Sequence, residues 1–138
     1  RLSPNGETQG CDDPDPAATF GAAARVLEEL KVSWLELRQP GPNGTFGRTD
    51  VPMQDALIRS HYSGPLVLNS DYSAAEAEAD ILSGRCEAIS FGRPYISNPD
   101  LAERIRIGAD WAPNVNVPQS WYLPGPAGYI DYPALTAA

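Results

Sequence analysis

The sequence predicts an α/β fold in which parallel strands alternate with helices. Three short apolar runs rich in β-forming residues, at 32–37, 65–69 and 86–91, are separated by segments with helical periodicity. Elements that alternate in this way form βαβ units with right-handed crossovers, so the strands lie parallel in one sheet. The 138 residues and the 42% apolar composition are sufficient for one domain with a core.

The first helix is predicted from about Asp15 to Leu30. Asp15 is a suitable N-cap and Pro16 suits the first turn of a helix. Apolar side chains recur on one face of this helix, at Phe20, Ala23, Ala24, Leu27 and Leu30. The strand at 32–37 follows, and the glycines and asparagine after Pro40 predict a loop.

Two further helices are predicted on either side of the second strand. The weaker one is expected over about 53–60, because Gly64 and Pro65 stop it before the strand begins. The stronger one begins at Ser73, which has the spacing of a capping box with Glu76, and Gly84 follows where this helix would end.

The stretch ISFGRPYISNPDL, residues 89–101, starts as a buried strand and then opens a helix. We expect this last helix to begin at Asn98 and to be ended by Gly108. Gly92 and Arg93 lie between strand and helix. A glycine, whose backbone is conformationally permissive, next to a fixed cation is suited to hold a phosphate. The alternative role for Arg93 is a salt bridge to a nearby carboxylate.

The number of strands indicates part of a closed barrel. Three full strands, and a fourth cut short at residues 1–3, would leave two edges of a parallel sheet unpaired, whereas a (β/α)8 TIM barrel has eight strands and typically about 250 residues. We therefore expect residues 1–138 to form the carboxyl-terminal half of such a barrel, roughly strands five to eight, followed by an aromatic tail from Asp110. We also expect that a chain starting at Arg1 has been processed, truncated or separated from an upstream segment.

Composition excludes several classes of function. A net charge of −8 and a pI near 4.4 argue against a nucleic-acid-binding surface, and no apolar run is long enough to cross a membrane. Cys11 and Cys86 lack the spacing of metal ligands, and the single His61 cannot complete a zinc site, so no metal is expected. Two reduced thiols predict a cytoplasmic protein.

Five segments together resemble the carboxyl-terminal part of the Old Yellow Enzyme family, most closely its bacterial ene-reductases. These segments are RLSPNGETQG, LELRQPGPNGTFG, LVLNSDY, ISFGRPYISNPDL and WYLPGPAGYIDYP. The resemblance implies a (β/α)8 barrel that binds FMN and takes electrons from NADH or NADPH. It also implies hydride transfer from reduced flavin to activated C=C bonds, as in enones and maleimides, with nitro compounds as further candidates.

The resemblance assigns a role in FMN binding to six residues. The FMN phosphate would lie at the carboxyl ends of the second and third predicted strands. Its ligands there would be Asn69, Ser70, Asp71, Gly92 and Arg93. Arg1 would lie near the pyrimidine edge of the flavin, where a cation stabilises the negative charge of the reduced ring.

Three aromatic residues are assigned to the substrate side by the same resemblance. Phe46 and Tyr122 would line the substrate pocket, and Trp121 would lie next to the flavin. The alternative for Phe46 is a packing anchor of its loop, and the alternative for Trp121 is an anchor of the tail to the core. Glu36, within the first predicted strand, must either face solvent or find a partner, and the sequence leaves both open.

No catalytic residue is expected in this chain, because the family's substrate clamp and proton-donating tyrosine lie in the amino-terminal half. We therefore expect an enzyme only in combination with that half as a separate polypeptide. Two alternatives remain open at this point. The chain could be a non-catalytic flavin- or phosphate-binding module, or two copies could form a swapped half-barrel dimer.

Overall fold

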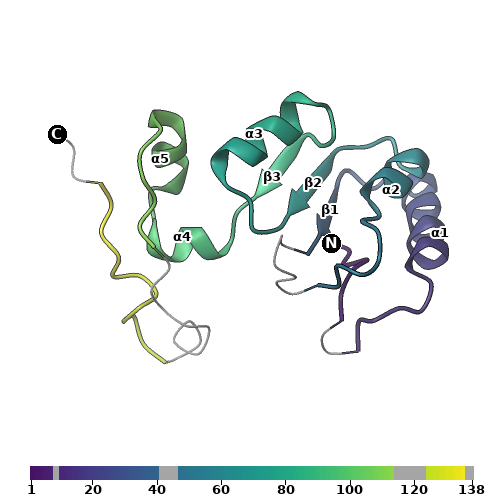
Figure 1. Ribbon diagram of the computed structural model, residues 1–138, viewed down its shortest axis with the longest axis horizontal. Coiled ribbons are helices and arrows are strands. Elements are labelled where there is room, and N and C mark those ends of the chain that lie inside the picture. Colours follow the sequence, from purple (N-terminus) through teal and green to yellow (C-terminus); the bar gives the residue numbers. More distant parts are fainter. Residues whose placement is uncertain (8–9, 41–46, 114–123, 136–138) are drawn as a thin grey trace. The chain divides into compact units, whose positions relative to one another are not determined.

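The computed structural model describes residues 1–7, 10–40, 47–113 and 124–135. The chain divides into two compact units, Arg1–Ser90 and Phe91–Ala138, and each is described by itself. The first unit contains a sheet with three helices, and the second contains two short helices (Figure 1).

The sheet of the first unit is parallel and follows chain order. Its strands are β1 (Leu35–Arg38), β2 (Leu66–Asn69) and β3 (Ala88–Ser90), with β2 in the centre. Leu2 forms a parallel bridge with Leu37, because its N–H donates to Glu36 O at 2.8 Å and its carbonyl accepts from Arg38 N at 2.9 Å. The start of the chain therefore extends the sheet beyond β1, as the truncated fourth strand predicted.

The three helices of this unit match the predicted segments, although the second begins at Asp55 rather than near Met53. They are α1 (Pro16–Glu29), α2 (Asp55–His61) and α3 (Ala74–Leu82). The Asp15 side chain caps α1 by accepting from Ala18 N at 3.1 Å, and Ser73 and Glu76 form the predicted capping box of α3. Gly84 follows α3 with a φ of +75°, a conformation that glycine adopts without strain.

The core lies on one face of the sheet. Leu35, Leu37, Leu66 and Leu68 alternate along β1 and β2 and are at most 3% exposed. They pack with residues from the helices and their flanking segments, namely Ala24, Ile58, Tyr62 and Cys86. The intervening strand residues, among them Glu36 and Asn69, are only half-buried on the opposite face.

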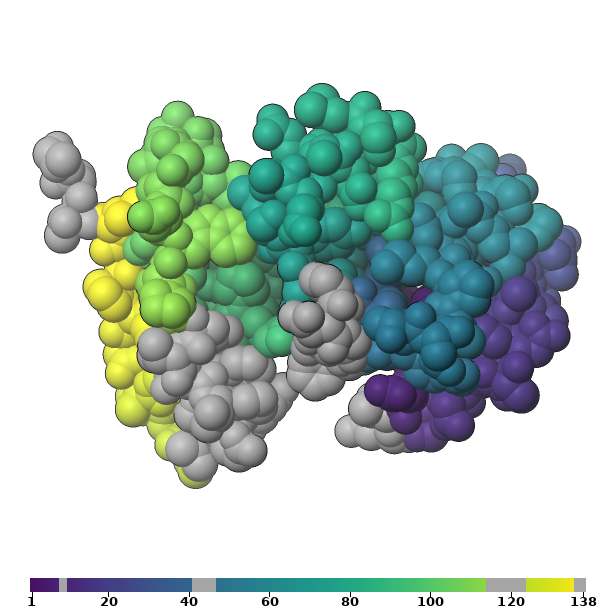
Figure 2. Space-filling model, viewed as in Figure 1, coloured from purple at the N-terminus to yellow at the C-terminus, as the bar shows by residue number. Residues whose placement is uncertain are grey.

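Asn5 joins the start of the chain to the segment before α2. It is 1% exposed, and its Nδ2 donates to Val51 O at 3.2 Å and to Pro52 O at 3.3 Å. Its carbonyl accepts from Arg48 N at 2.7 Å. Figure 2 shows the amino-terminal residues, in purple, against the blue segment near residue 50. These bonds hold the start of the chain against the segment before α2.

The second unit corrects the predicted start of the last helix. It contains α4 (Arg93–Ser97), which was not predicted, and α5 (Leu101–Ile107). Asn98 does not begin a helix: it is wholly buried, and its Nδ2 donates to Pro94 O at 2.8 Å and to Ala112 O at 3.1 Å. Because these contacts occupy its side chain, Asp100 stands at the N-cap of α5 instead. Gly108 ends α5 as expected, with a φ of +66°. Among the described residues, no helix has the length and apolarity needed to cross a membrane.

Candidate functional site

The face of the sheet opposite the core carries a polar cluster of four residues. We call it the Arg1 cluster, and its members are Arg1, Glu36, Asn69 and Ser90. The Arg1 guanidinium donates to Asn69 Oδ1, and its Nε lies 3.7 Å from Glu36 Oε2. Ser90 Oγ donates to Glu36 Oε1 at 2.6 Å, and Asn69 Nδ2 donates to Ser90 O at 2.9 Å. The cluster therefore joins the start of the chain to all three strands.

The Arg1 cluster settles the alternatives for Glu36. Its carboxylate has partners on both sides, Arg1 and Ser90, rather than facing solvent alone. Arg38 lies two residues further along β1, on the same face as Glu36. Burial lowers the pKa of Arg38, and the charge of Arg1 lowers it further. The cationic side chains of Arg1 and Arg38 therefore both lie toward the carboxyl ends of β1 and β2, and the carboxylate of Glu36 on β1 pairs with Arg1.

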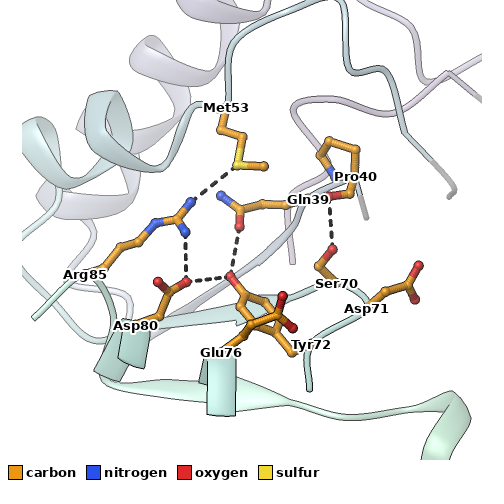
Figure 3. Close-up of a pocket in the computed structure, with 9 residues that line it drawn as sticks. All are labelled: Gln39, Pro40, Met53, Ser70, Asp71, Tyr72, Glu76, Asp80 and Arg85. Atoms are coloured by element: carbon orange, nitrogen blue, oxygen red, sulfur yellow. Dashed lines mark hydrogen bonds and ion pairs between the residues drawn. The ribbon is translucent and has the colours of Figure 1, made fainter. Parts of the chain in front are cut away.

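The loop after β2 begins at Ser70 and Asp71. Ser70 Oγ donates to Pro40 O at 3.0 Å, which ties this loop to the segment that follows β1. A pocket of about 300 Å³ adjoins the loop (Figure 3). It is lined by Gln39, Pro40, Met53, Ser70, Asp71, Tyr72, Glu76, Asp80 and Arg85.

A network of ion pairs lies along this pocket, and we call it the Arg85 brace: Asp55, Tyr72, Asp80 and Arg85. Arg85 Nε donates to Asp55 Oδ2 at 2.7 Å, and Arg85 Nη1 donates to Asp80 Oδ2 at 2.8 Å. Tyr72 Oη donates to the same Asp80 oxygen at 2.9 Å. The hydrogen bond to Asp55 raises the pKa of Arg85, and burial followed by the bond to Asp80 raises the pKa of Tyr72.

Gly92 and Arg93 belong to the second unit, where they begin α4. Gly92 is the N-cap of α4 with a φ of −106°, so its backbone does not require glycine. A Cβ built on Gly92 would meet no atom of the described structure within 4 Å. The missing side chain therefore leaves the backbone accessible on that side. Arg93 is the first residue of α4.

Several predicted site residues lie outside the described residues, namely Phe46, Trp121 and Tyr122. Sequence reasoning did not single out the Arg85 brace. Its four members come from α2, the loop after β2, α3 and the segment before β3, and no local spacing connects them. The one local signal is Tyr72, an aromatic residue directly before the N-cap Ser73 of α3.

The described residues contain no group of His, Cys, Asp and Glu that could hold a metal ion. Cys86 is buried and Cys11 is exposed, and both are free thiols. Burial raises the pKa of the Cys86 thiol, which keeps it protonated and unreactive near neutral pH. His61 Nε2 lies 3.1 Å from Arg25 Nη1, outside the Arg1 cluster and the Arg85 brace.

No protein-family model matches the chain, but solved structures and curated proteins do. The structure of the old yellow enzyme homologue from Zymomonas mobilis matches with a TM-score of 0.89 and 46% sequence identity. The match covers 98% of this chain and 38% of that one. The chain belongs to the Old Yellow Enzyme family. Its parallel strands and alternating helices match part of the family's TIM barrel, which confirms the predicted fold class.

Other Old Yellow Enzyme relatives give the same picture. Morphinone reductase, solved in complex with tetrahydroNAD, matches with a TM-score of 0.82 and 31% identity over 99% of this chain and 35% of its own. A Leishmania infantum protein named as a probable flavin mononucleotide-dependent alkene reductase is 30% identical over 96% of this chain and 34% of its own length. The chain thus spans little more than a third of the length of these relatives.

Proposed function

We propose that this chain is the FMN-binding part of an ene-reductase that uses NADH or NADPH to reduce activated C=C bonds. The observation that carries the proposal is the Arg1 cluster. It places the Arg1 guanidinium against Asn69, at the carboxyl end of β2, in a chain 46% identical to an old yellow enzyme homologue. Ligands of parallel α/β barrels bind at this end of the strands. The names of relatives support the flavin, the alkene and the nicotinamide donor.

The residues present fit FMN. A phosphate needs N–H donors and nearby positive charge, and the loop at Ser70 and Asp71 begins where β2 ends. The backbone at Gly92 has open space where a side chain would stand, and Arg93 follows it. We assign the phosphate to these four residues and Asn69, and the pyrimidine edge of the flavin to Arg1.

FMN, when bound, supplies the hydride chemistry between the nicotinamide donor and the alkene. The part of this chain is to hold the phosphate and to place the positive charge of Arg1 where reduced flavin carries negative charge. We assign Phe46 and Tyr122 to the substrate pocket and Trp121 to the neighbourhood of the flavin. We assign the substrate clamp and the proton donor to a complementary amino-terminal half on a separate chain.

Native mass spectrometry and an activity assay test this proposal together. We expect a complex heavier than this chain by one larger polypeptide and one FMN, and NADPH- or NADH-dependent reduction of cyclohexenone by that complex. Flavin binding without turnover by the complex would leave only a binding module. A mass equal to this chain, or to a multiple of it, without flavin would contradict the proposal.

Gly92→Ala tests the phosphate site in the assembled protein. We expect weaker FMN binding, because a methyl group would occupy the open space beside the backbone, and unchanged stability, because φ is −106°. Gly84→Ala is the matched control: its φ of +75° predicts a loss of about 1 kcal/mol of stability with unchanged FMN affinity. For each variant, fluorescence titration with FMN measures the affinity and urea unfolding measures the stability. Equal FMN affinity of Gly92→Ala and wild type would remove Gly92 from the site.

A further inference from the structure

Tyr72 connects the loop after β2 to the Arg85 brace. We propose that Tyr72 is a positioning residue for the phosphate of FMN, acting through the backbone of Ser70 and Asp71. This inference rests on the proposed function. In this role the Tyr72 side chain does not touch the flavin itself.

The Tyr72 hydroxyl donates to Asp80, and the other members of the Arg85 brace hold Asp80 in place. Asp80 lies on α3, Asp55 is the first residue of α2, and Arg85 precedes β3. Asp80 Oδ2 accepts from both Tyr72 Oη and Arg85 Nη1, at 2.9 and 2.8 Å, so it is fixed from two directions (Figure 3). Arg85 is held in turn by Asp55.

Burial makes this arrangement resistant to displacement. The Tyr72 ring packs against the hydrophobic core, and the Asp55 side chain is only 12% exposed. Moving the Tyr72 hydroxyl away would remove one of the two hydrogen-bond donors to Asp80 Oδ2. Tyr72 is therefore anchored at its ring by packing and at its hydroxyl by a hydrogen bond to Asp80. A hydrogen bond to a charged acceptor of this kind is stronger than one between neutral groups.

The loop to be positioned is short and anchored at both ends. Asn69 belongs to β2 and is bonded to Arg1 and to Ser90 O, whereas Tyr72 is anchored by Asp80. Only Ser70 and Asp71 lie between these anchors, and Ser70 Oγ is bonded to Pro40 O. Backbone N–H groups held in this way lose little further entropy when they bind an anion.

Tyr72→Phe separates positioning of the phosphate from general stability. FMN and riboflavin share the flavin ring and differ by the phosphate, so the ratio of their affinities reports the phosphate site alone. For the assembled protein, freed of flavin, we expect Tyr72→Phe to weaken FMN binding about 3- to 10-fold and to leave riboflavin binding unchanged.

Tyr62→Phe is the matched control. Tyr62 is also buried and its hydroxyl donates to Val32 O at 2.7 Å, but it precedes β2 rather than following it. Tyr62→Phe should lower stability and leave the ratio of FMN to riboflavin affinity unchanged. An unchanged ratio for Tyr72→Phe would overturn the positioning role alone. A wild-type protein that binds FMN no more tightly than riboflavin would overturn the phosphate site of the proposed function itself.

Discussion

Glu87 makes two interactions at the beginning of β2. Its Oε2 accepts from Leu66 N and from Arg59 Nη2, both at 2.6 Å. Leu66 is wholly buried, so without Glu87 its N–H would lose this acceptor. The hydrogen bond from Leu66 is the main cause that lowers the pKa of Glu87, and the bond from Arg59 lowers it further.

The charge on Glu87 should therefore make stability depend on pH. Its pKa is lower in the folded state, so its contribution is present above the unfolded pKa of about 4.3 and is lost as pH falls through the folded value. Glu87→Gln should cost up to about 1 kcal/mol at pH 7 and nothing at acid pH. Urea unfolding at pH 7, 5 and 3 measures this, with the exposed Glu29→Gln as control. A cost that persists unchanged to pH 3 would contradict the prediction.

At the scale of elements, caps decide where the helices begin. Ser73 accepts from Glu76 N at 3.3 Å, while Glu76 Oε2 accepts from Ser73 N at 2.8 Å. This reciprocal pair depends on neighbours in sequence, and the sequence predicted it. The start of α5 depends instead on Asn98, whose partners Pro94 and Ala112 are set by the fold.

Ser73→Ala should lower the free energy of unfolding by about 1 kcal/mol, because Glu76 N loses its acceptor at the first turn of α3. Ser83→Ala is the matched control at the other end of this helix, where the hydroxyl donates to Asp80 O at 2.9 Å. We expect that variant to change stability by less than about 0.5 kcal/mol. Thermal or urea unfolding compares the two. Equal effects would mean that the capping box does not limit the stability of α3.

At the scale of the whole molecule, the sheet of the described residues ends at β3 on one side and at Leu2 on the other. Unpaired strand edges favour association with further strands. This supports the proposal of a complementary amino-terminal half that supplies the remaining strands of the barrel.

The isolated chain should self-associate as its concentration rises, and the complementary half should suppress this association. Sedimentation velocity over a range of concentrations, with and without that half, tests the prediction. A chain that stays monomeric, melts cooperatively and carries flavin by itself would show that no partner is needed.

The sequence by itself determined the alternation of parallel strands with helices, the caps of α1 and α3, and the family, because these depend on periodicity, local spacing and contiguous motifs. It also predicted Gly84 and Gly108 at helix ends, since a positive φ is a property of single residues. Only the tertiary structure decided the partners of Glu36, the burial of Asn98 and the membership of the Arg85 brace. These contacts join residues such as Glu36 and Ser90 that lie 54 positions apart. Their pairing follows from how the strands and helices pack, and local sequence does not encode it.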